Sequence, residues 1–199
     1  MKIWDRIARV YAKKRFFGRG LFKEEKLLLP KFLADCKLIL DAGCGTGRHL
    51  KFLEKFGKVI GIDYSKKMIK HALKRTKTLI LADLRALPFK PKVFDCTVCL
   101  GNTLGSLEKG YEKAIQELNR VTSKRVILEV RIAEKDRKYK RRFEKFFYPV
   151  KVWSKKSFED LLKASGLTKF ELVEGHKFKD SEFVYAIFEP KNLRPKPKI

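Results

Sequence analysis

The stretch LILDAGCGTGRHL, residues 38–50, decides which fold we expect for this chain. An apolar run ends in Asp41, and glycines then occupy the alternate positions 43, 45 and 47. The pattern predicts a buried strand, a turn that is nearly free of side chains, and a helix directly behind the turn. A helix N-terminus preceded by such a turn is typical of sites for nucleotide-like ligands.

The spacing of the glycines separates this turn from two other ligand-binding turns. The dinucleotide fingerprint GxGxxG needs a third glycine at position 48, where the chain has Arg48. A phosphate-binding loop of the form GxxxxGKS or GxxxxGKT does not occur in the sequence. The pattern present is DxGxGxG, which begins with an acid. Asp41 therefore suits a ligand that carries an ammonium group better than one that carries a pyrophosphate.

Strand-like and helix-like segments alternate along the chain. The alternation predicts the α/β class, as a doubly wound, mostly parallel seven-stranded sheet with a C-terminal antiparallel hairpin. We expect a single domain over 1–189, with an N-terminal helical cap at 1–34 and a basic-aromatic insertion at 131–156, followed by a basic tail at 190–199. The expected strands are 37–42, 58–63, 78–82, 93–99, 125–130, 168–173 and 183–188. The expected helices lie near 47–56, 65–75, 109–122 and 155–165, the last one capped by Ser157.

Four stretches resemble the class I S-adenosylmethionine-dependent methyltransferases, in the order LDAGCGTG, VIGIDYS, LADLRALPF and FDCTVCLGNTLGSL. The resemblance covers about residues 1–189. It implies the Rossmann-like fold of that family, S-adenosyl-L-methionine as cofactor and S-adenosyl-L-homocysteine as product. It also implies that Asp63 binds the ribose hydroxyls and that Asp83 and Leu84 flank the adenine. The cofactor-binding residues that we expect are Asp41, Gly43, Cys44, Gly45, Gly47, Asp63, Tyr64, Met68, Asp83, Leu84, Leu100 and Gly101. Alternatively, Asp63 caps the helix after Ser65, and Asp83 is a turn residue.

The acceptor side of the expected site offers three candidate catalytic residues. Methyl transfer from a sulfonium requires alignment and exclusion of water, and it requires a strong base only for a weak nucleophile. Asn102 would orient the acceptor by hydrogen bonding, or it is a turn residue after its strand. Tyr11 belongs to WDRIARVY, which resembles the WDxxAxxY helix that covers the pocket in many family members. Arg131 follows the fifth expected strand and could pair with a carboxylate or phosphate of the acceptor.

The residues after the fourth expected strand disfavour two classes of acceptor. Enzymes that methylate exocyclic base amines carry two prolines there, whereas this chain has LGNT at 100–103. Cytosine-C5 enzymes place a nucleophilic cysteine beside a proline, and Cys99 lacks that proline. The acceptors that remain are a carboxylate, an amine, a ring nitrogen, or a hydroxyl with a base.

The cysteines and the apolar runs bear on the cellular compartment. We expect the four cysteines to be reduced, because they fit a reducing compartment better than a disulfide framework. Cys96 and Cys99 have CxxC spacing, but they point to opposite faces of an expected strand and no second pair follows, so we expect buried thiols rather than a metal or redox site. No metal site is expected. The charged N-terminus and the absence of a long apolar run predict a cytoplasmic protein that binds no membrane. The many charges beside few amides resemble the composition of hyperthermophile proteins.

The net charge of +25 is concentrated in three segments, 1–31, 131–156 and 190–199, which together carry +19. We interpret them either as a charge-rich surface exposed to solvent or as a surface for RNA, with transfer RNA as the leading candidate. Bases and aromatics are interleaved in 137–153, a composition suited to tracking a phosphate backbone and stacking unpaired bases. Alternatively, Phe143, Phe146 and Phe147 form the apolar side of a lid helix.

Three hypotheses for the function follow. The leading one is a methyltransferase acting on RNA, since the chain shares its general plan with wobble-uridine tRNA carboxymethyl methyltransferases. In this chain, however, CLGNTLGSL replaces their usual histidine-containing stretch. The second hypothesis is a small-molecule N- or O-methyltransferase, because LGNTLGSL is similar to enzymes that methylate glycine. The third is a noncatalytic RNA-binding protein that kept the methyltransferase fold.

Overall fold

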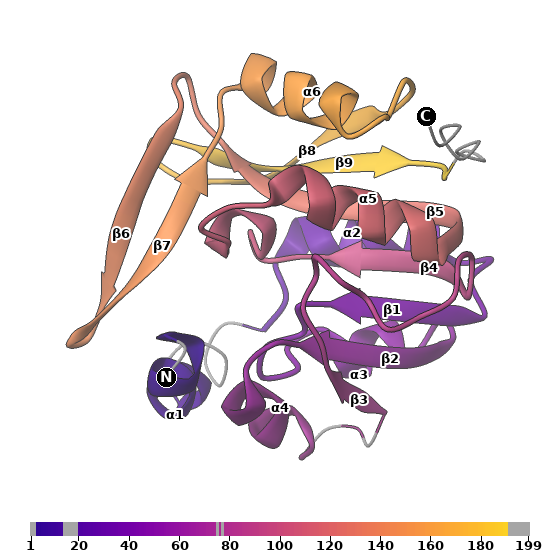
Figure 1. Cartoon of the computed structure of the whole chain (residues 1–199), viewed down its shortest axis with the longest axis horizontal. Helices are drawn as coiled ribbons and strands as arrows, with labels where there is room; N and C mark the ends of the chain where they lie inside the picture. The colour runs from indigo at the N-terminus through magenta and orange to yellow at the C-terminus, as the bar shows by residue number, and fades with distance from the viewer. Residues whose placement is uncertain (1–2, 14–19, 75, 77, 191–199) are drawn as a thin grey trace, which may run out of the picture.

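The computed structural model describes residues 3–13, 20–74, 76 and 78–190, and its centre is a seven-stranded sheet with helices on both faces (Figure 1). The strand order is β3-β2-β1-β4-β5-β9-β8. Strands β1 to β5 pair in parallel, and β9 is antiparallel to both of its neighbours. The expected fold class is confirmed, and the antiparallel strand lies second from one edge. The strands are β1 Leu38–Ala42, β2 Lys58–Asp63, β3 Leu79–Leu81, β4 Phe94–Cys99, β5 Thr122–Ile132, β8 Glu171–Lys177 and β9 Glu182–Phe188.

Alternation of side chains along the strands divides the core between the two faces of the sheet. In β1, Leu40 and Ala42 pack with the helices of one face, α5 and α6, whereas Ile39 packs with α2 and α3 on the other face. The strand order reverses between β1 and β4, which opens a crevice at the carboxyl ends of these strands. Among the described residues, no helix is long and apolar enough to cross a membrane. The helices are α2 Lys23–Leu33, α3 Leu50–Leu53, α4 Lys66–Ala72, α5 Tyr111–Val121 and α6 Lys155–Ala164.

Helix α1 (Ile3–Tyr11) lies beside this crevice, between α4 and a separate hairpin (Figure 1). Its buried residues Ile7 and Ala8 pack with Met68 of α4 and with Tyr148 and Val150 of the hairpin. These contacts form a third small core. Helix α1 therefore covers the carboxyl ends of the strands, whereas α2, in the second half of the expected cap, packs on one face of the sheet.

The basic-aromatic insertion forms the antiparallel hairpin of β6 (Arg137–Phe143) and β7 (Phe146–Val152), apart from the main sheet. The alternative of a lid helix is wrong. A two-residue turn at 144–145, with Glu144 at φ 56°, splits the segment into two strands and sets Phe143 opposite Phe146. Cross-strand pairing satisfies the backbone hydrogen bonds of the two segments, and the alternation of side chains in β7 buries Tyr148 and Val150.

Helix α6 begins at Lys155, so its N-cap is Ser154 and not Ser157. The hydroxyl of Ser154 accepts the backbone N–H of Ser157 at 3.2 Å, which is the bond an N-cap side chain makes to the third helical residue. The hydroxyl of Ser157 instead donates to Asp136. The expected cap was therefore placed three residues too late.

Two of the four cysteines form a disulfide, so the expectation of four reduced cysteines is wrong for this pair. Cys36 follows α2 and Cys96 lies in β4, with Cα atoms 5.9 Å apart. The two residues are 60 positions apart in the sequence, and only the packing of α2 on the sheet brings them together. Cys44 and Cys99 are buried thiols, as expected.

Candidate active site

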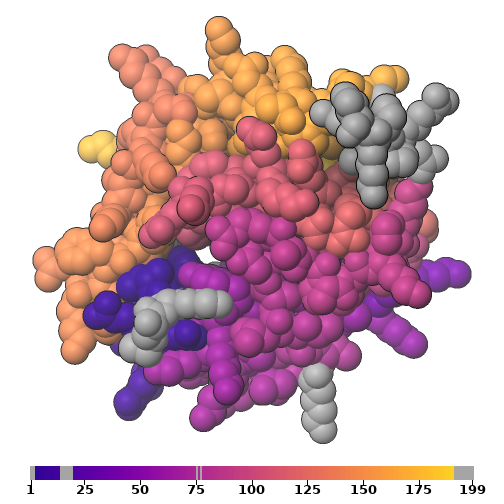
Figure 2. Space-filling model, in the orientation of Figure 1, coloured from indigo at the N-terminus to yellow at the C-terminus, as the bar shows by residue number. Residues whose placement is uncertain are grey.

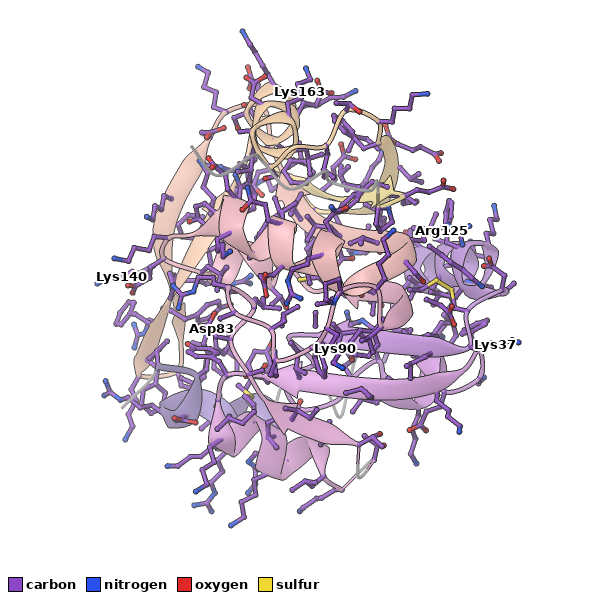
Figure 3. All side chains as sticks on the ribbon, turned by 45° about the vertical axis from the view of Figure 1, so that its right-hand side comes forward. Lys37, Asp83, Lys90, Arg125, Lys140 and Lys163 are labelled. Atoms are coloured by element: carbon purple, nitrogen blue, oxygen red, sulfur yellow. A yellow bond between two sulfur atoms is a disulfide. The ribbon has the colours of Figure 1, made fainter. Side chains whose placement is uncertain are left out.

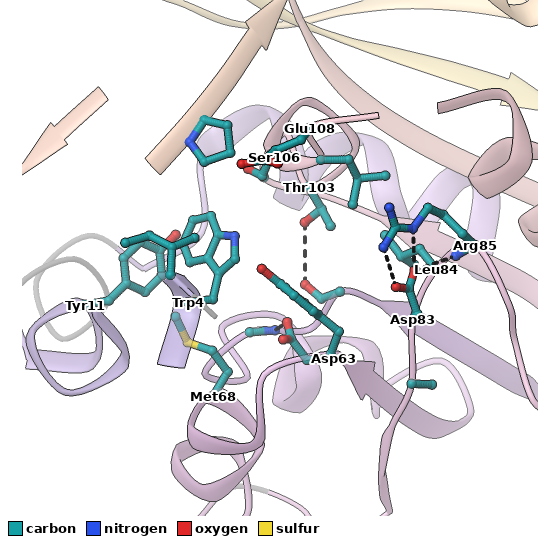
Figure 4. A pocket seen from close by; sticks show the side chains of 18 residues that line it. Trp4, Tyr11, Asp63, Met68, Asp83, Leu84, Arg85, Thr103, Ser106 and Glu108 are labelled. Carbon is teal, nitrogen blue, oxygen red and sulfur yellow. Dashed lines mark hydrogen bonds and ion pairs between the residues drawn. The ribbon is translucent and has the colours of Figure 1, made fainter. Parts of the chain in front are cut away.

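A cavity of about 350 Å³ lies at the carboxyl ends of β1, β2, β3 and β4, below the hairpin (Figure 4). Figure 2 shows the molecule hollowed beside the indigo residues of α1. Eight of the predicted cofactor-binding residues line the cavity. These are Gly43, Gly45, Asp63, Tyr64, Met68, Asp83, Leu84 and Gly101.

The glycine turn supplies the floor of the cavity. Gly43, Gly45 and Gly47 have φ angles of 81°, 55° and 83°, which side-chain-bearing residues rarely adopt. A Cβ on Gly43 would lie 2.3 Å from Cγ2 of Thr103, whereas a Cβ on Gly45 would meet no protein atom within 4 Å. Gly43 therefore allows close packing of the turn, and Gly45 leaves its space open to the cavity.

Asp63 ends β2 and holds the glycine turn from the side. Its Oδ2 accepts the N–H of Gly45 at 3.0 Å, and its Oδ1 accepts the N–H of Ser65 at 2.8 Å. The sequence offered helix capping as the alternative role of Asp63. In the structure the N-cap of α4 is Ser65, whose hydroxyl accepts the N–H of Met68 at 3.2 Å. The same hydroxyl donates to Asp5 of α1 at 2.6 Å, which ties the N-terminal helix to this edge of the cavity.

Asp41 lies below the turn and does not line the cavity. Its side chain is buried on the same face of β1 as Ile39, and its Oδ2 has no hydrogen-bond partner among the described residues. Burial raises the pKa of Asp41 to about 7, an effect that Arg48 opposes and that the charge of Asp63 adds to. A buried carboxyl oxygen without a partner is costly when charged, and the raised pKa favours the neutral form of Asp41.

A second buried carboxyl, that of Glu129, lies under the turn that follows β4. It accepts the N–H of Gly101, and burial raises its pKa to about 7. By contrast, Glu25 of α2 binds Arg48 and His49. Burial alone would raise the pKa of Glu25, but the hydrogen bonds and charges of His49 and Arg48 outweigh it and lower the pKa to about 2.

Asp83 follows β3 and is clamped by Arg85, on the side of the cavity opposite α1 (Figure 4). Arg85 donates from Nε at 2.9 Å and from a terminal nitrogen at 2.6 Å to the two carboxylate oxygens. The backbone N–H of Arg85 adds a bond of 2.9 Å, so Asp83 also has the turn role that the sequence offered. The guanidinium becomes part of the cavity wall next to Leu84.

Of the three candidate catalytic residues, the structure brings only Tyr11 to the cavity. Asn102 is 7% exposed and is bonded through its amide to the backbone of Arg131 and Lys151. Arg131 extends toward the loop between β8 and β9, where Nε donates to Ser181 at 2.8 Å. These bonds direct Asn102 and Arg131 away from an acceptor in the cavity.

The remaining predicted cofactor residues, Cys44, Gly47 and Leu100, support the turns from outside the cavity. Several residues that the sequence motifs did not predict also line the cavity, among them Trp4, Arg85, Thr103, Glu108 and Pro149. Trp4 had a signal, since it precedes Tyr11 by seven residues and so shares its helical face. Pro149 had none, because strand pairing far from the motifs places it there.

Comparisons with known proteins find a matching family, related sequences and similar solved structures. The family described as a methyltransferase domain matches residues 39–125. The uncharacterized protein MJ0638 of Methanocaldococcus jannaschii is 32% identical over 185 residues, which cover 92% of this chain and 74% of that protein. The crystal structure of PH0226 from Pyrococcus horikoshii has a TM-score of 0.73 at 22% identity, covering 96% of this chain and all of that one. An S-adenosylmethionine-dependent methyltransferase of Clostridium acetobutylicum has a TM-score of 0.68 at 14% identity, covering 94% and 99%.

Relatives whose names state an acceptor match smaller parts of their length. A probable tRNA methyltransferase 9B of Mus musculus is 32% identical over 120 residues, 58% of this chain and 26% of that protein. A malonyl-[acyl-carrier protein] O-methyltransferase of Hamiltonella defensa is 33% identical over 108 residues, 52% of this chain and 41% of that protein. The two names state different acceptors, so the acceptor has to be argued from this chain's own surface.

Proposed function

The chain belongs to the class I S-adenosylmethionine-dependent methyltransferases, and on that premise we propose that its methyl acceptor is an RNA, with transfer RNA as the first candidate. The cofactor supplies a methyl group on a sulfonium, so the protein has to hold the donor, align the acceptor and exclude water.

The residues at the cavity fit this cofactor. The open space over Gly45 admits a ligand against the backbone, and Asp63 places a carboxylate at the edge where ribose hydroxyls can donate to it. Leu84 and Met68 offer apolar surface for the adenine side.

The acceptor side of the cavity is formed by α1 and the hairpin. Trp4 and Tyr11 meet edge to face, with ring centroids 5.7 Å apart, and Pro149 of β7 lines the same side. Figure 4 shows Trp4 and Tyr11 on the side of the cavity opposite Asp83. These groups bound the space in which an acceptor can approach the donor and displace water.

One face of the hairpin carries the proposal, because it joins the cavity to a basic surface. In the antiparallel register, Lys138, Lys140 and Arg142 stand opposite Lys151, Pro149 and Phe147, so all six share one face. Pro149 lines the cavity, and Phe147 is 53% exposed. The Lys138 ammonium donates to the carbonyl of Glu108 at the cavity rim at 2.9 Å. A chain of phosphates laid on this face would lead an exposed base to the cavity mouth.

Part of the opposite face of the hairpin is used for packing. Tyr148 and Val150 are buried against α1, and the Trp4 and Tyr148 rings are 5.1 Å apart. The two faces thus differ. On one face Tyr148 and Val150 are covered by α1 while Tyr139 and Arg141 remain exposed, and on the other face Lys140, Arg142 and Phe147 are all exposed. A neutral metabolite would have no use for a basic surface of this extent.

Transfer of labelled methyl groups to an unmodified transfer-RNA transcript pool, measured at several salt concentrations, tests the proposal. The informative variant is Lys140→Ala with Arg142→Ala. Its matched control, Lys37→Ala with Lys163→Ala, removes the same charge at exposed positions before β1 and on α6, away from the hairpin (Figure 3).

Each phosphate contact contributes about one unit to the slope of log affinity against log salt. The hairpin variant should therefore lower the RNA-binding slope by about two units and reduce transfer to RNA, while the control leaves both unchanged. Equal behaviour of the two variants would refute RNA contact at the hairpin. Transfer to a small molecule with no response to salt would favour the small-molecule hypothesis instead.

A further inference from the structure

We propose that Asn102 is a positioning residue that fixes strand β7, and with it the acceptor wall of the cavity, to the turn packed against the cofactor-binding glycines. The inference concerns the arrangement of the site and does not require that the acceptor be RNA.

Asn102 bridges three separate elements with one side-chain amide. Its Oδ1 accepts the N–H of Arg131, the penultimate residue of β5, at 3.0 Å. Its Nδ2 donates to the carbonyl of Lys151 in β7 at 3.2 Å. Its own backbone belongs to the turn after β4, where its carbonyl accepts the hydroxyl of Ser106 at 3.2 Å. The amide oxygen and nitrogen are thereby both used within the protein.

The backbone at Asn102 is shaped for this bridge. Its φ is 56° and that of Gly101 is 69°, so two successive residues adopt the left-handed region that non-glycine residues rarely occupy. Gly105 lacks the side chain that would block the contact, since a Cβ there would lie 2.4 Å from Nδ2 of Asn102 and 2.6 Å from the carbonyl oxygen of Lys151. Left-handed backbone at a non-glycine residue persists where surrounding bonds determine it.

The turn after β4 connects β7 to the cofactor side of the cavity. Next to Asn102, Thr103 donates from its hydroxyl to the carbonyl of Leu100 at 2.7 Å, and its Cγ2 lies against Gly43 of the glycine turn. On the other side of the bridge, Pro149 lies two residues before Lys151 and lines the cavity. The amide of Asn102 joins these two walls through hydrogen bonds.

Hydrogen exchange with and without S-adenosylhomocysteine tests the coupling, because it needs neither an acceptor nor turnover. In the wild type, the ligand should slow exchange of the amides in 137–152 by at least about fivefold, since filling the cavity stabilises both of its walls. In Asn102→Gly, which keeps the left-handed backbone and removes both bonds, the slowing should fall below about twofold. Calorimetric affinity for the ligand should stay within about threefold of wild type, because the glycine turn and Asp63 are intact.

Lys92→Gly is the matched control. Lys92 also has a left-handed φ, of 58°, but it precedes β4 at the end of the sheet opposite the cavity. This variant should retain the full effect of the ligand on 137–152, which separates the loss of the bridge from the added flexibility of glycine.

If Asn102→Gly does not melt cooperatively, Asn102→Asp tests the bridge to β7 in its place. The aspartate keeps the acceptor for Arg131 but presents an oxygen to the Lys151 carbonyl, so the ligand should no longer slow exchange in β7 while the Arg131 amide stays protected. Retention of the wild-type slowing in the bridge variants would overturn the proposal. Absence of any slowing in the wild type would overturn it equally.

Discussion

Replacement of Asp63 by alanine should weaken cofactor binding. A substitution elsewhere that destabilises the protein equally should leave cofactor binding unchanged. Asp63 has two functions in the account above, as the expected acceptor for the ribose hydroxyls and as the acceptor for the backbone N–H of Gly45 and Ser65. Loss of hydrogen bonds from the ligand to a carboxylate costs about 1–3 kcal/mol. At 1.4 kcal/mol for each factor of ten, the dissociation constant of S-adenosylhomocysteine should rise about 5- to 150-fold.

Asp95 offers a control with the same local chemistry. Its carboxylate also accepts two backbone N–H groups, those of Lys37 at 2.8 Å and Leu38 at 3.0 Å, but at the amino end of β1, opposite the cavity. Asp63→Ala and Asp95→Ala should each lower the free energy of unfolding by about 1–3 kcal/mol, because each leaves two N–H groups without their charged acceptor.

Isothermal titration calorimetry with S-adenosylhomocysteine, combined with urea unfolding, separates the two functions of Asp63. Asp95→Ala should lose stability and keep wild-type affinity, whereas Asp63→Ala should lose both. Wild-type affinity in Asp63→Ala would remove Asp63 from the cofactor site. An equal loss of affinity in Asp95→Ala would mean that general destabilisation, and not a ligand contact, explains the effect.

Three further predictions test the turn, the buried acid and the disulfide. Gly45→Val should lose ligand binding in calorimetry, because its side chain fills open space over the turn and its φ of 55° strains a β-branched residue, whereas Gly43→Ala should lower the melting temperature, because its Cβ collides with the neighbouring turn. The pKa of Asp41 is raised to about 7, so the folded protein keeps a proton that the unfolded chain releases near pH 4, and this contribution to stability declines as pH rises from about 4 to 7. Asp41→Asn, compared with wild type in urea at pH 5 and pH 8, should therefore be relatively more stable at pH 8. Thiol titration of the denatured, unreduced protein should find two free thiols rather than four, and Cys36→Ser with Cys96→Ser should cost about 4 kcal/mol by the chain-entropy relation for a loop of 60 residues.

The sequence was sufficient to predict those parts of the fold that depend on local periodicity. The apolar runs at 37–42 and 58–63 became β1 and β2 within one residue, because a buried parallel strand is apolar on both faces. The glycine turn and Asp63 came to the cavity for a related reason, since residues after parallel strands gather at one edge of the sheet.

The parts that the sequence did not predict depend on contacts between distant segments. The partners of Asn102 are 29 and 49 residues away, and its burial follows from where β5 and β7 end. Its amide looked available for an acceptor only because these partners were not visible in its local sequence. Arg131 was expected at the acceptor for its place after a strand, yet its side chain turns to Ser181, 50 residues on.

The hairpin of β6 and β7 could be predicted only in part. Its composition pointed correctly to a basic, aromatic surface, but the same residues fitted a helix or a strand pair. Only cross-strand register decides which basic side chains stand with Phe147 and Pro149 and which stand with the buried Tyr148. The register therefore identifies the face of the hairpin that we propose to bind RNA.

The most direct measurement of the central claim is the destination of the methyl group. The protein would be incubated with methyl-labelled S-adenosylmethionine and separated RNA, protein and small-metabolite fractions from cells lacking the gene. The account predicts label in the RNA fraction, reduced by Lys140→Ala with Arg142→Ala and unaffected by Lys37→Ala with Lys163→Ala. Label confined to small metabolites or protein would contradict RNA as the acceptor, and the hairpin's charge would then need another explanation.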